Sequence, residues 1–254
     1  MRTYRKLITI SSLFVKLLIV LFFTLSANDS IAQQHDFDAL MREYGMVNIQ
    51  DLDSEILVDL KYATEDNFVG KNMYGGLKCA YLEKEFANRV ALAQKILKKR
   101  NPNYTLLIYD AARPISTQRI MHKMVEDTEF EGFVADGTRG GRHNFGVAVD
   151  LTIATTDGKA LDMGAGFDEF SKASYVKGTP DTSDPKTRTI EIYRGYAESQ
   201  VANGTLSRSA ADNRILLIEV MCEAGFYPYR LEWWHYEDIM SMDSVRKQYR
   251  LLDF

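Results

Sequence analysis

The feature that most constrains the fold is a predicted strand that carries a carboxylate, within the stretch GRHNFGVAVDLTI that begins at Gly141. Apolar side chains alternate along it from Phe145 to Ile153, which predicts a β-strand with one apolar face. The alternating apolar residues have odd numbers, whereas Asp150 lies between two of them, so its carboxylate points to the other face of the strand. A carboxylate in such a run is costly to bury unless it is paired or binds a metal ion. An arginine partner and a bound metal ion are therefore the two interpretations of Asp150.

Strand and helix patterns are mixed, without regular alternation, along the remaining chain. Further strands are predicted over residues 56–62, with Tyr62 pointing inward, over residues 104–110 and over the closing segment LEWWHYE, residues 231–237. Helices are predicted within 33–46, over 82–99, after Pro114 and from Ser209 to Gly225, with a loop over 131–144 and a surface excursion over 171–190. The pattern predicts one α+β domain with a mostly antiparallel sheet flanked by helices.

Residues 1–32 have the features of a secretory signal peptide. Basic residues precede an apolar run over residues 17–25, and the small residues Ser30 and Ala32 suit a cleavage site. The apolar run is too short to span a bilayer, which takes about 20 residues. We therefore expect an exported, periplasmic protein that keeps no membrane anchor after cleavage and whose domain spans residues 33–254. An uncleaved anchor is the alternative.

Charge and cysteine content narrow the class of protein. The chain has a net charge of −4, and the segment before the predicted cleavage site carries +3, which leaves −7 on the mature chain. Such an acidic domain is not expected to bind nucleic acid, because phosphate contacts require clustered Lys and Arg. Cys79 and Cys222 are too few for a Cys-type zinc site. Because disulfides persist outside the cytoplasm, we expect a disulfide between them.

Two of the four histidines lie in segments that suggest chemistry. His35 adjoins the predicted cleavage site, and His122 lies on the predicted helix after Pro114, where a surface or packing role is expected. His143 follows a pair of glycines that permit an unusual backbone path or close approach of a substrate. His235 stands within the aromatic run of RLEWWHYE. His143 and His235 are therefore the candidate functional histidines.

Together with Asp150, these two histidines form a set of three possible metal ligands. A catalytic zinc ion takes three protein ligands and keeps a fourth position for water. Glu232 is then left to accept the proton of that water. Residues three apart in a flat strand point to opposite faces, so Glu232 and His235 converge only if the chain bends at the two tryptophans between them. The alternative for this pair alone is a core histidine beside a surface acid.

Five stretches of the chain resemble the motifs of one protein family and occur in that family's order. GRHNFGVAVDLTI is similar to a His-x₆-Asp zinc element, and EWWHYE to an E-x-W-H element. LKYATEDNFVGK (residues 60–71), YDAARP (109–114) and LDMGAGFDEF (161–170) extend the match over nearly the whole mature chain. Together they resemble the zinc D-Ala-D-Ala peptidases, and the VanX-type D-alanyl-D-alanine dipeptidases in particular. The resemblance implies a small α+β fold of the hedgehog/DD-peptidase type.

The resemblance also implies roles for the residues that match the family's motifs. It implies one zinc ion per chain, held by His143, Asp150 and His235. It implies that Glu232 is the general base and that Arg113 holds the oxyanion of the tetrahedral intermediate. In this mechanism a zinc-bound water attacks the peptide carbonyl, and Glu232 passes its proton to the leaving amine.

Two further residues are implied in substrate binding by the same resemblance. Asp168 matches an acid that holds the free amino group of the substrate, and Tyr62 matches a tyrosine that lines the same pocket. The chain departs from the family at Gly141, where the family often has a serine that helps to bind the substrate. Arg142 and Asn144 are the neighbours that would compensate, and the sequence does not choose between them.

The leading hypothesis is a secreted zinc dipeptidase that acts on D-alanyl-D-alanine or a closely related small D,D-dipeptide. Asp168 favours a dipeptidase over a D,D-carboxypeptidase that trims longer wall peptides. Retention of Glu232 and Arg113 argues against a non-catalytic, zinc-containing module that binds the cell wall. An exported enzyme of this kind is expected to recover D-alanine from wall turnover, since cytoplasmic precursors are out of its reach.

Overall fold

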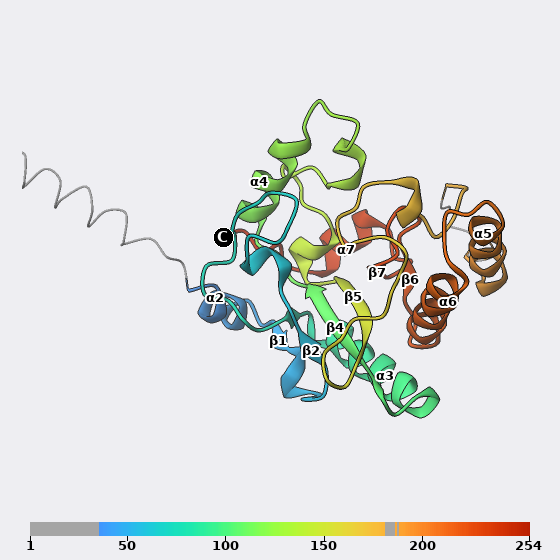
Figure 1. The fold of residues 1–254 in the computed structure, drawn as a ribbon. Coiled ribbons are helices and arrows are strands. Elements are labelled where there is room, and N and C mark those ends of the chain that lie inside the picture. The colour runs from blue at the N-terminus through green and yellow to red at the C-terminus, as the bar shows by residue number, and fades with distance from the viewer. Residues whose placement is uncertain (1–35, 181–185, 187) are drawn as a thin grey trace, which may run out of the picture. The chain divides into compact units, whose positions relative to one another are not determined.

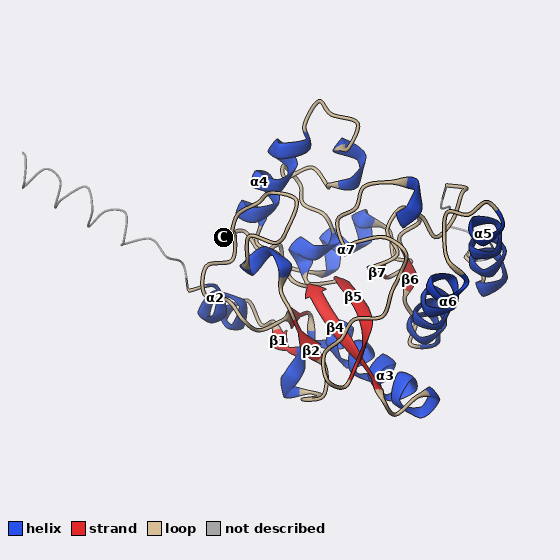
Figure 2. Ribbon diagram, viewed as in Figure 1, coloured by secondary structure: helices blue, strands red, loops and turns tan. Residues whose placement is uncertain are grey.

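A five-stranded sheet organises the computed structural model, which describes residues 36–180, 186 and 188–254. The predicted signal segment 1–32 and His35 lie outside the described residues. Phe37–Phe254 form one unit of mixed helices and strands (Figures 1 and 2). The helices are α2 (Phe37–Glu43), α3 (Lys84–Arg100), α4 (Ile115–Val125), α5 (Ile190–Ala202), α6 (Arg208–Glu223) and α7 (Met242–Gln248). The strands are β1 (Val47–Asn48), β2 (Leu57–Val58), β3 (Tyr81–Leu82), β4 (Tyr104–Asp110), β5 (Ala148–Thr155), β6 (Tyr227–Pro228) and β7 (His235–Glu237).

The main sheet has the strand order β2-β4-β5-β7-β6. β2 pairs with β4 in parallel, whereas the other three pairings are antiparallel, which confirms the predicted mostly antiparallel sheet. β4 and β5 pair from Tyr104 opposite Thr155 to Asp110 opposite Asp150. β1 and β3 form a separate two-stranded sheet. The mixed α/β architecture agrees with the predicted fold class.

The predicted helices are present, with small shifts at their ends. α3 begins directly after Glu83, because the Glu83 side chain accepts hydrogen bonds from the backbone N–H groups of Glu85 and Phe86. α4 begins directly after Pro114, as predicted. α6 begins after Ser207, whose side chain caps it, two residues before the predicted start. α3 packs against both β4 and α6 and so covers the sheet.

α5 and α7 are helices that the sequence pattern did not predict. α5 packs against α6, and this tertiary contact outweighs the low helix propensity of Gly195 in its middle. α7 is short and begins after Ser241, whose side chain accepts a hydrogen bond from the Ser244 backbone. None of the described helices is both long and apolar enough to cross a membrane.

Two predicted strands are shorter than expected. The strand predicted over 56–62 is reduced to β2, because the chain turns into a 3-10 helix at Lys61–Ala63. Tyr62 lies in this helix and is buried, so its predicted inward direction is correct although its predicted strand is wrong. The strand predicted over 231–237 is reduced to β7, because turns precede it.

β5 is buried on both faces and lies between β4 and β7 in the sheet. It begins at Ala148, after a 3-10 helix over Arg142–Phe145, and not at Phe145 as predicted. Residues 148–154 are all buried, so the alternation in the sequence does not mark a side that faces solvent. The face that carries Asp150 is enclosed as well, and this carboxylate must find its partners inside the protein.

The predicted disulfide is wrong, because Cys79 and Cys222 are both free cysteines. Cys79 lies near Asp38, whereas Cys222 lies on α6 near Glu219. Burial raises the pKa of both thiols, that of Cys222 to about 12. An even number of cysteines and expected export were therefore not enough to predict a disulfide.

We expect the denatured, non-reduced protein to titrate two thiols per chain with a thiol reagent. In the folded protein at neutral pH, Cys222 should react slowly, because only the thiolate is the nucleophile and burial disfavours it. The denatured Cys222→Ser variant, titrating one thiol, is the control. Finding no thiol in the denatured wild type would show that the disulfide exists.

Candidate metal centre and active site

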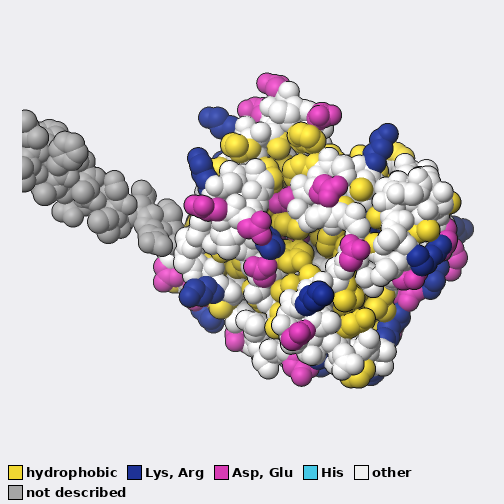
Figure 3. Space-filling view, viewed as in Figure 1, with side chains coloured by type: hydrophobic (Ala, Val, Ile, Leu, Met, Phe, Trp, Pro, Cys, Tyr) yellow, Lys and Arg dark blue, Asp and Glu magenta, His cyan; other side chains and the backbone are white. Residues whose placement is uncertain are grey.

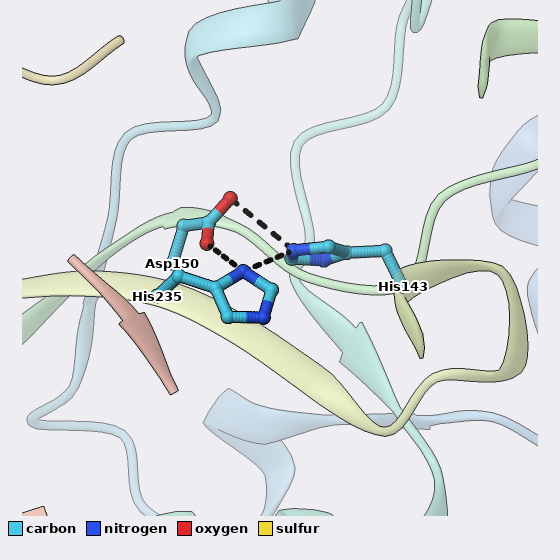
Figure 4. Close-up of side chains that lie close together, drawn as sticks. All are labelled: His143, Asp150 and His235. Carbon is cyan, nitrogen blue, oxygen red and sulfur yellow. Dashed lines mark hydrogen bonds and ion pairs between the residues drawn. The ribbon is translucent and has the colours of Figure 1, made fainter. Parts of the chain in front are cut away.

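The side chains of His143, Asp150 and His235 point toward one another from separate segments (Figure 4). His143 Nε2 lies 3.4 Å from Asp150 Oδ2, and His235 Nδ1 lies 3.0 Å from Asp150 Oδ1. The facing nitrogens of the two histidines are 3.2 Å apart. One ligand atom from each residue falls within 4.8 Å of the others. The structure thus brings together the three residues that the sequence indicated as a set.

The register of the sheet places this cluster. Asp150 on β5 lies opposite His235 on β7 and opposite Asp110 on β4. The pairing of β4 shifts by one residue between Ile108 and Asp110, and this bulge sets the Asp110 carboxylate next to the cluster. His143 reaches the same point from the 3-10 helix that precedes β5. Three neighbouring strands and one short helix therefore converge on one spot.

Each histidine is held by a hydrogen bond on its outer ring nitrogen. His143 Nδ1 lies 2.7 Å from the Ala111 carbonyl, to which it donates, so Nε2 is left to bind a metal ion. His235 Nε2 lies 3.2 Å from Glu237 Oε2 and donates to that carboxylate, so Nδ1 is left. Two imidazole nitrogens and one carboxylate oxygen are a donor set that suits a divalent transition metal ion. The cluster therefore fits such an ion.

The charges of the cluster depend on one another. Burial would raise the pKa of Asp150, but the two adjacent histidines hold it well below its usual range. Burial would lower the pKa of His235, but its hydrogen bonds with Asp150 and Glu237 raise it to about 10. A protonated imidazole cannot bind a metal ion, so metal binding displaces a proton from this cluster.

Glu237 is a site residue that the sequence analysis missed. Its carboxylate accepts a hydrogen bond from His235 and also lies 2.7 Å from Arg142 Nε. Burial opposes its ionisation, but His235 and Arg142 keep its pKa below the usual value. Residues two apart on a strand share a face, so its spacing from His235 was a signal for this contact. An outer carboxylate of this kind fixes the orientation of a metal-binding histidine.

Glu232 lies beside the cluster because the chain bends between it and His235, as predicted. The Glu232 N–H donates to the Tyr229 carbonyl, and the His235 N–H donates to the Glu232 carbonyl. Trp233 and Trp234 are buried in this bend and pack edge to face. Glu232 Oε2 lies 3.8 Å from His235 Nδ1, and burial raises the pKa of the Glu232 carboxyl to about 8. Such a group can accept and release a proton near neutral pH.

Arg113 lies in the site, but the protein already uses part of its guanidinium. Nε and Nη2 donate to Asp110 Oδ2 at 2.9 and 2.5 Å, and Nη1 donates to Gln118 Oε1 at 2.9 Å. The Tyr74 hydroxyl donates to the other oxygen of Asp110 at 2.6 Å. Nη2 is also 3.8 Å from Asp150 Oδ2. The guanidinium therefore joins two carboxylates that would otherwise repel each other across β4 and β5.

Asp168 and Tyr62 form a second polar pair at the site. The Tyr62 hydroxyl is 3.0 and 2.9 Å from the two carboxylate oxygens of Asp168, to which it donates. Asp168 has a left-handed backbone conformation with φ 58°, which is uncommon for a residue other than glycine. Burial raises the pKa of Asp168 to about 7. The rings of Phe68 and Phe170, 5.3 Å apart, also line this part of the site.

One cavity of about 260 Å³ connects these groups. All seven predicted site residues line it, namely Tyr62, Arg113, His143, Asp150, Asp168, Glu232 and His235. His122 faces the Val134 carbonyl and lies apart from the cavity lining, in agreement with its predicted packing role. Hydrophobic side chains gather near the middle of the face shown in Figure 3, with charged side chains around them. The sequence thus identified a set of residues that share one cavity.

The chain matches the family model described as D-ala-D-ala dipeptidase over residues 42–189 and 196–251. It is 32% identical over 192 residues to the D-alanyl-D-alanine dipeptidase of Escherichia coli (strain K12), which covers 76% of this chain and 83% of that protein. The D-alanyl-D-alanine dipeptidase of Enterococcus faecium is 28% identical over 217 residues, 76% of this chain and 91% of that protein. The D-alanyl-D-alanine dipeptidase of Enterococcus faecalis (strain ATCC 700802 / V583) is 28% identical over 216 residues, which cover 77% of this chain and 92% of that protein. All seven predicted site residues fall within the matched ranges.

We expect Glu237→Gln to weaken the binding of a divalent metal ion about 10- to 100-fold, because the outer hydrogen bond no longer orients His235 as well. Competition with a chelator of known affinity measures the effect. Asp238→Asn is the matched control, since this neighbouring acid pairs with Arg89 at 2.6 Å. Equal metal affinities in the two variants would exclude this role for Glu237.

Proposed function

The chain belongs to the D-Ala-D-Ala dipeptidase family and is a peptidase, and we propose that it is a zinc enzyme that hydrolyses D-alanyl-D-alanine. The observation that carries the proposal is the cluster of His143, Asp150 and His235 with the buried carboxyl of Glu232 beside it. In a peptidase, this arrangement combines a metal site with a proton acceptor. The names of the relatives supply the choice of dipeptide.

Zinc suits this donor set better than magnesium or calcium, which prefer oxygen ligands alone. When bound, one zinc ion per chain would acidify a water molecule and polarise the carbonyl of the substrate. Catalytic zinc sites use three protein ligands, and His143 Nε2, His235 Nδ1 and an Asp150 oxygen would provide them. The hydrogen bonds to Ala111 and Glu237 engage the outer nitrogen of each imidazole, so that the inner nitrogens would face the ion once His235 has lost its extra proton.

Glu232 is proposed to move the proton in this reaction. A cation held by the neighbouring cluster would lower its pKa from about 8, so that the carboxylate form is available at neutral pH. The carboxylate then accepts a proton from the attacking water and delivers it to the nitrogen of the leaving D-alanine. Trp234, which lines the cavity beside Glu232, keeps bulk water from this proton path.

Arg113 is proposed to stabilise the negative charge that develops on the carbonyl oxygen. Its contacts with Asp110 and Gln118 use one N–H of each nitrogen, so Nη1 and Nη2 each keep a second N–H. These groups are fixed before the substrate binds, so little reorganisation is needed during the reaction. The same contacts link catalysis to stability, because loss of Arg113 would leave the buried Asp110 carboxylate without its cationic partner at a cost of about 3–5 kcal/mol.

Asp168 and Tyr62 are proposed to bind the free amino group of the dipeptide. An ammonium beside Asp168 would lower the pKa of this carboxyl from about 7 and stabilise its charged form. A longer wall peptide has an uncharged amide nitrogen at this position and would leave the Asp168 charge without a partner. Phe68 and Phe170 also narrow the space beside Asp168. These features favour a dipeptidase over a carboxypeptidase.

We further propose that the enzyme acts outside the cytoplasm, in the periplasm, because residues 1–32 have the features of a signal peptide. In that compartment it would recover D-alanine released by wall turnover. We also assign the α+β domain to the hedgehog/DD-peptidase type, on the basis of the sequence motifs and the mostly antiparallel sheet.

Purified protein of residues 33–254 is expected to cleave D-Ala-D-Ala, to leave L-Ala-L-Ala intact, and to release little D-alanine from a wall pentapeptide. A chelator should abolish the activity and Zn²⁺ should restore it, with one zinc per chain by elemental analysis. Preferred cleavage of the pentapeptide would identify a carboxypeptidase. Full turnover by the metal-free protein would refute the zinc mechanism.

Glu232→Ala is expected to keep its zinc and to lower kcat for D-Ala-D-Ala at least ~10²–10⁴-fold, the usual contribution of general acid–base catalysis. Glu223→Ala, which removes an exposed acid that pairs with Arg100, is the control and should retain wild-type turnover. Zinc content and turnover are measured on the same samples. Wild-type rates in zinc-loaded Glu232→Ala would assign the proton transfer to another residue.

A further inference from the structure

We propose that Arg142 binds the C-terminal carboxylate of the dipeptide and makes the enzyme selective for substrates with a free carboxyl end. This inference rests on the proposed function and adds a specificity residue to it. Arg142 lines the cavity, and its side chain is 12% exposed. Its Nη1 atom is buried and has no hydrogen-bond partner within the part of the chain that the structure describes.

Arg113 and Arg142 are the arginines that line the cavity, and they differ in whether a guanidinium nitrogen remains without a hydrogen-bond acceptor. Every nitrogen of Arg113 already donates to Asp110 or Gln118, and the guanidinium also lies 3.8 Å from Asp150. A carboxylate that approached Arg113 would therefore meet two buried acids that share its charge. Arg142 is the better partner, because one of its nitrogens has no acceptor among the described residues.

The other two nitrogens of Arg142 hold its guanidinium in place. Nε lies 2.7 Å from Glu237 Oε2, and Nη2 donates to the Met240 carbonyl at 2.5 Å. Glu237 shares its carboxylate with His235, so it offsets the charge of Arg142 only in part. A buried donor without an acceptor is unfavourable, and a carboxylate is the acceptor that a guanidinium matches best. Substrate binding would therefore satisfy a donor that the protein leaves unused.

Arg142 and Asp168 lie at the two ends of a row of contacts that passes through the metal cluster. In order, the row contains Asp168, Tyr62, Arg113, Asp150, His235, Glu237 and Arg142. A dipeptide zwitterion presents its groups in the same order, with an ammonium, then the carbonyl to be cleaved, then a carboxylate. The order of these contacts therefore agrees with a dipeptide whose ends would face Asp168 and Arg142 and whose carbonyl would face the cluster.

The residues next to Arg142 cannot take this role. A Cβ added at Gly141 would lie 2.7 Å from the Ala135 Cβ, so a side chain there requires Ala135 to move. Asn144 is fully buried, and its amide is committed to the backbone. Its Oδ1 accepts from the Gly141 N–H and its Nδ2 donates to the Arg113 carbonyl, each at 2.8 Å. The alternative that the sequence left open between Arg142 and Asn144 is thereby decided in favour of Arg142.

The test compares hydrolysis of D-Ala-D-Ala and of its C-terminal amide by the wild type and by Arg142→Gln. The wild type should prefer the acid. In Arg142→Gln, kcat/KM for the acid should fall about 10- to 100-fold, mainly through KM, as expected for loss of a hydrogen bond to a charged group. The value for the amide should change little, so the preference for the acid disappears. Arg142→Lys should recover part of it, because a point charge lacks the planar fork.

Arg139→Gln is the matched control, because this exposed arginine lies on the same segment and should keep the wild-type preference. A purely structural effect of Arg142→Gln, transmitted through Glu237 to the metal site, would lower metal affinity and slow both substrates equally. Metal content is therefore measured for each variant. An unchanged acid-to-amide ratio in zinc-loaded Arg142→Gln would overturn the inference.

Failure of the proposed function has a different outcome, in which the wild type hydrolyses neither substrate. Titration calorimetry on zinc-loaded Glu232→Ala, with and without Arg142→Gln, tests the inference independently of turnover. Tighter binding of the acid that requires Arg142 would support it. Equal affinities for the acid and the amide, or binding of neither, would refute it.

Discussion

The buried charges of the site hold one another in place, and the surrounding structure keeps them in contact. Carboxylates alternate with cationic or imidazole side chains in the order Asp110, Arg113, Asp150, His235, Glu237 and Arg142. A single charge at such depth would cost several kcal/mol, and removing one partner leaves the next one uncompensated. The site therefore tolerates poorly the loss of a member at its buried centre, such as Arg113 or Asp150, and a bound cation would complete the balance of charge there.

The sheet supplies the spacing that this network needs. The register sets Asp110, Asp150 and His235 side by side on three neighbouring strands. The β-bulge before Asp110 sets its carboxylate opposite that of Asp150, and two such carboxylates would repel each other. Arg113 contacts both of them and so stabilises the pair. A sheet of this kind fixes distances between side chains far more rigidly than loops do, which suits a metal site.

The bend before β7 places Glu232 beside the cluster of His143, Asp150 and His235. β7 begins only at His235, after Trp233 and Trp234. Both tryptophans are buried and pack against each other, so packing stabilises the bend. Glu232 is thereby placed next to His235 without becoming a member of the His143, Asp150 and His235 set. In the proposed reaction the same geometry keeps the proton acceptor apart from the metal ligands.

The sequence by itself indicated His143, Asp150 and His235 as a set of possible metal ligands, with Glu232 and the bend beside it. It also determined the strand over 104–110, the helix over 82–99 and the helix after Pro114. These follow from local periodicity, capping residues and motif spacing, which act over a few residues. Only the tertiary structure showed that Glu237 supports His235, that Asp110 holds Arg113, and that the two cysteines stay apart. It also ended the predicted strand before Tyr62 and engaged the Asn144 amide with the backbone of Gly141 and Arg113, because those outcomes depend on contacts between segments far apart in the chain. Local patterns do not encode such contacts, since burial and hydrogen-bond competition are decided when the segments pack.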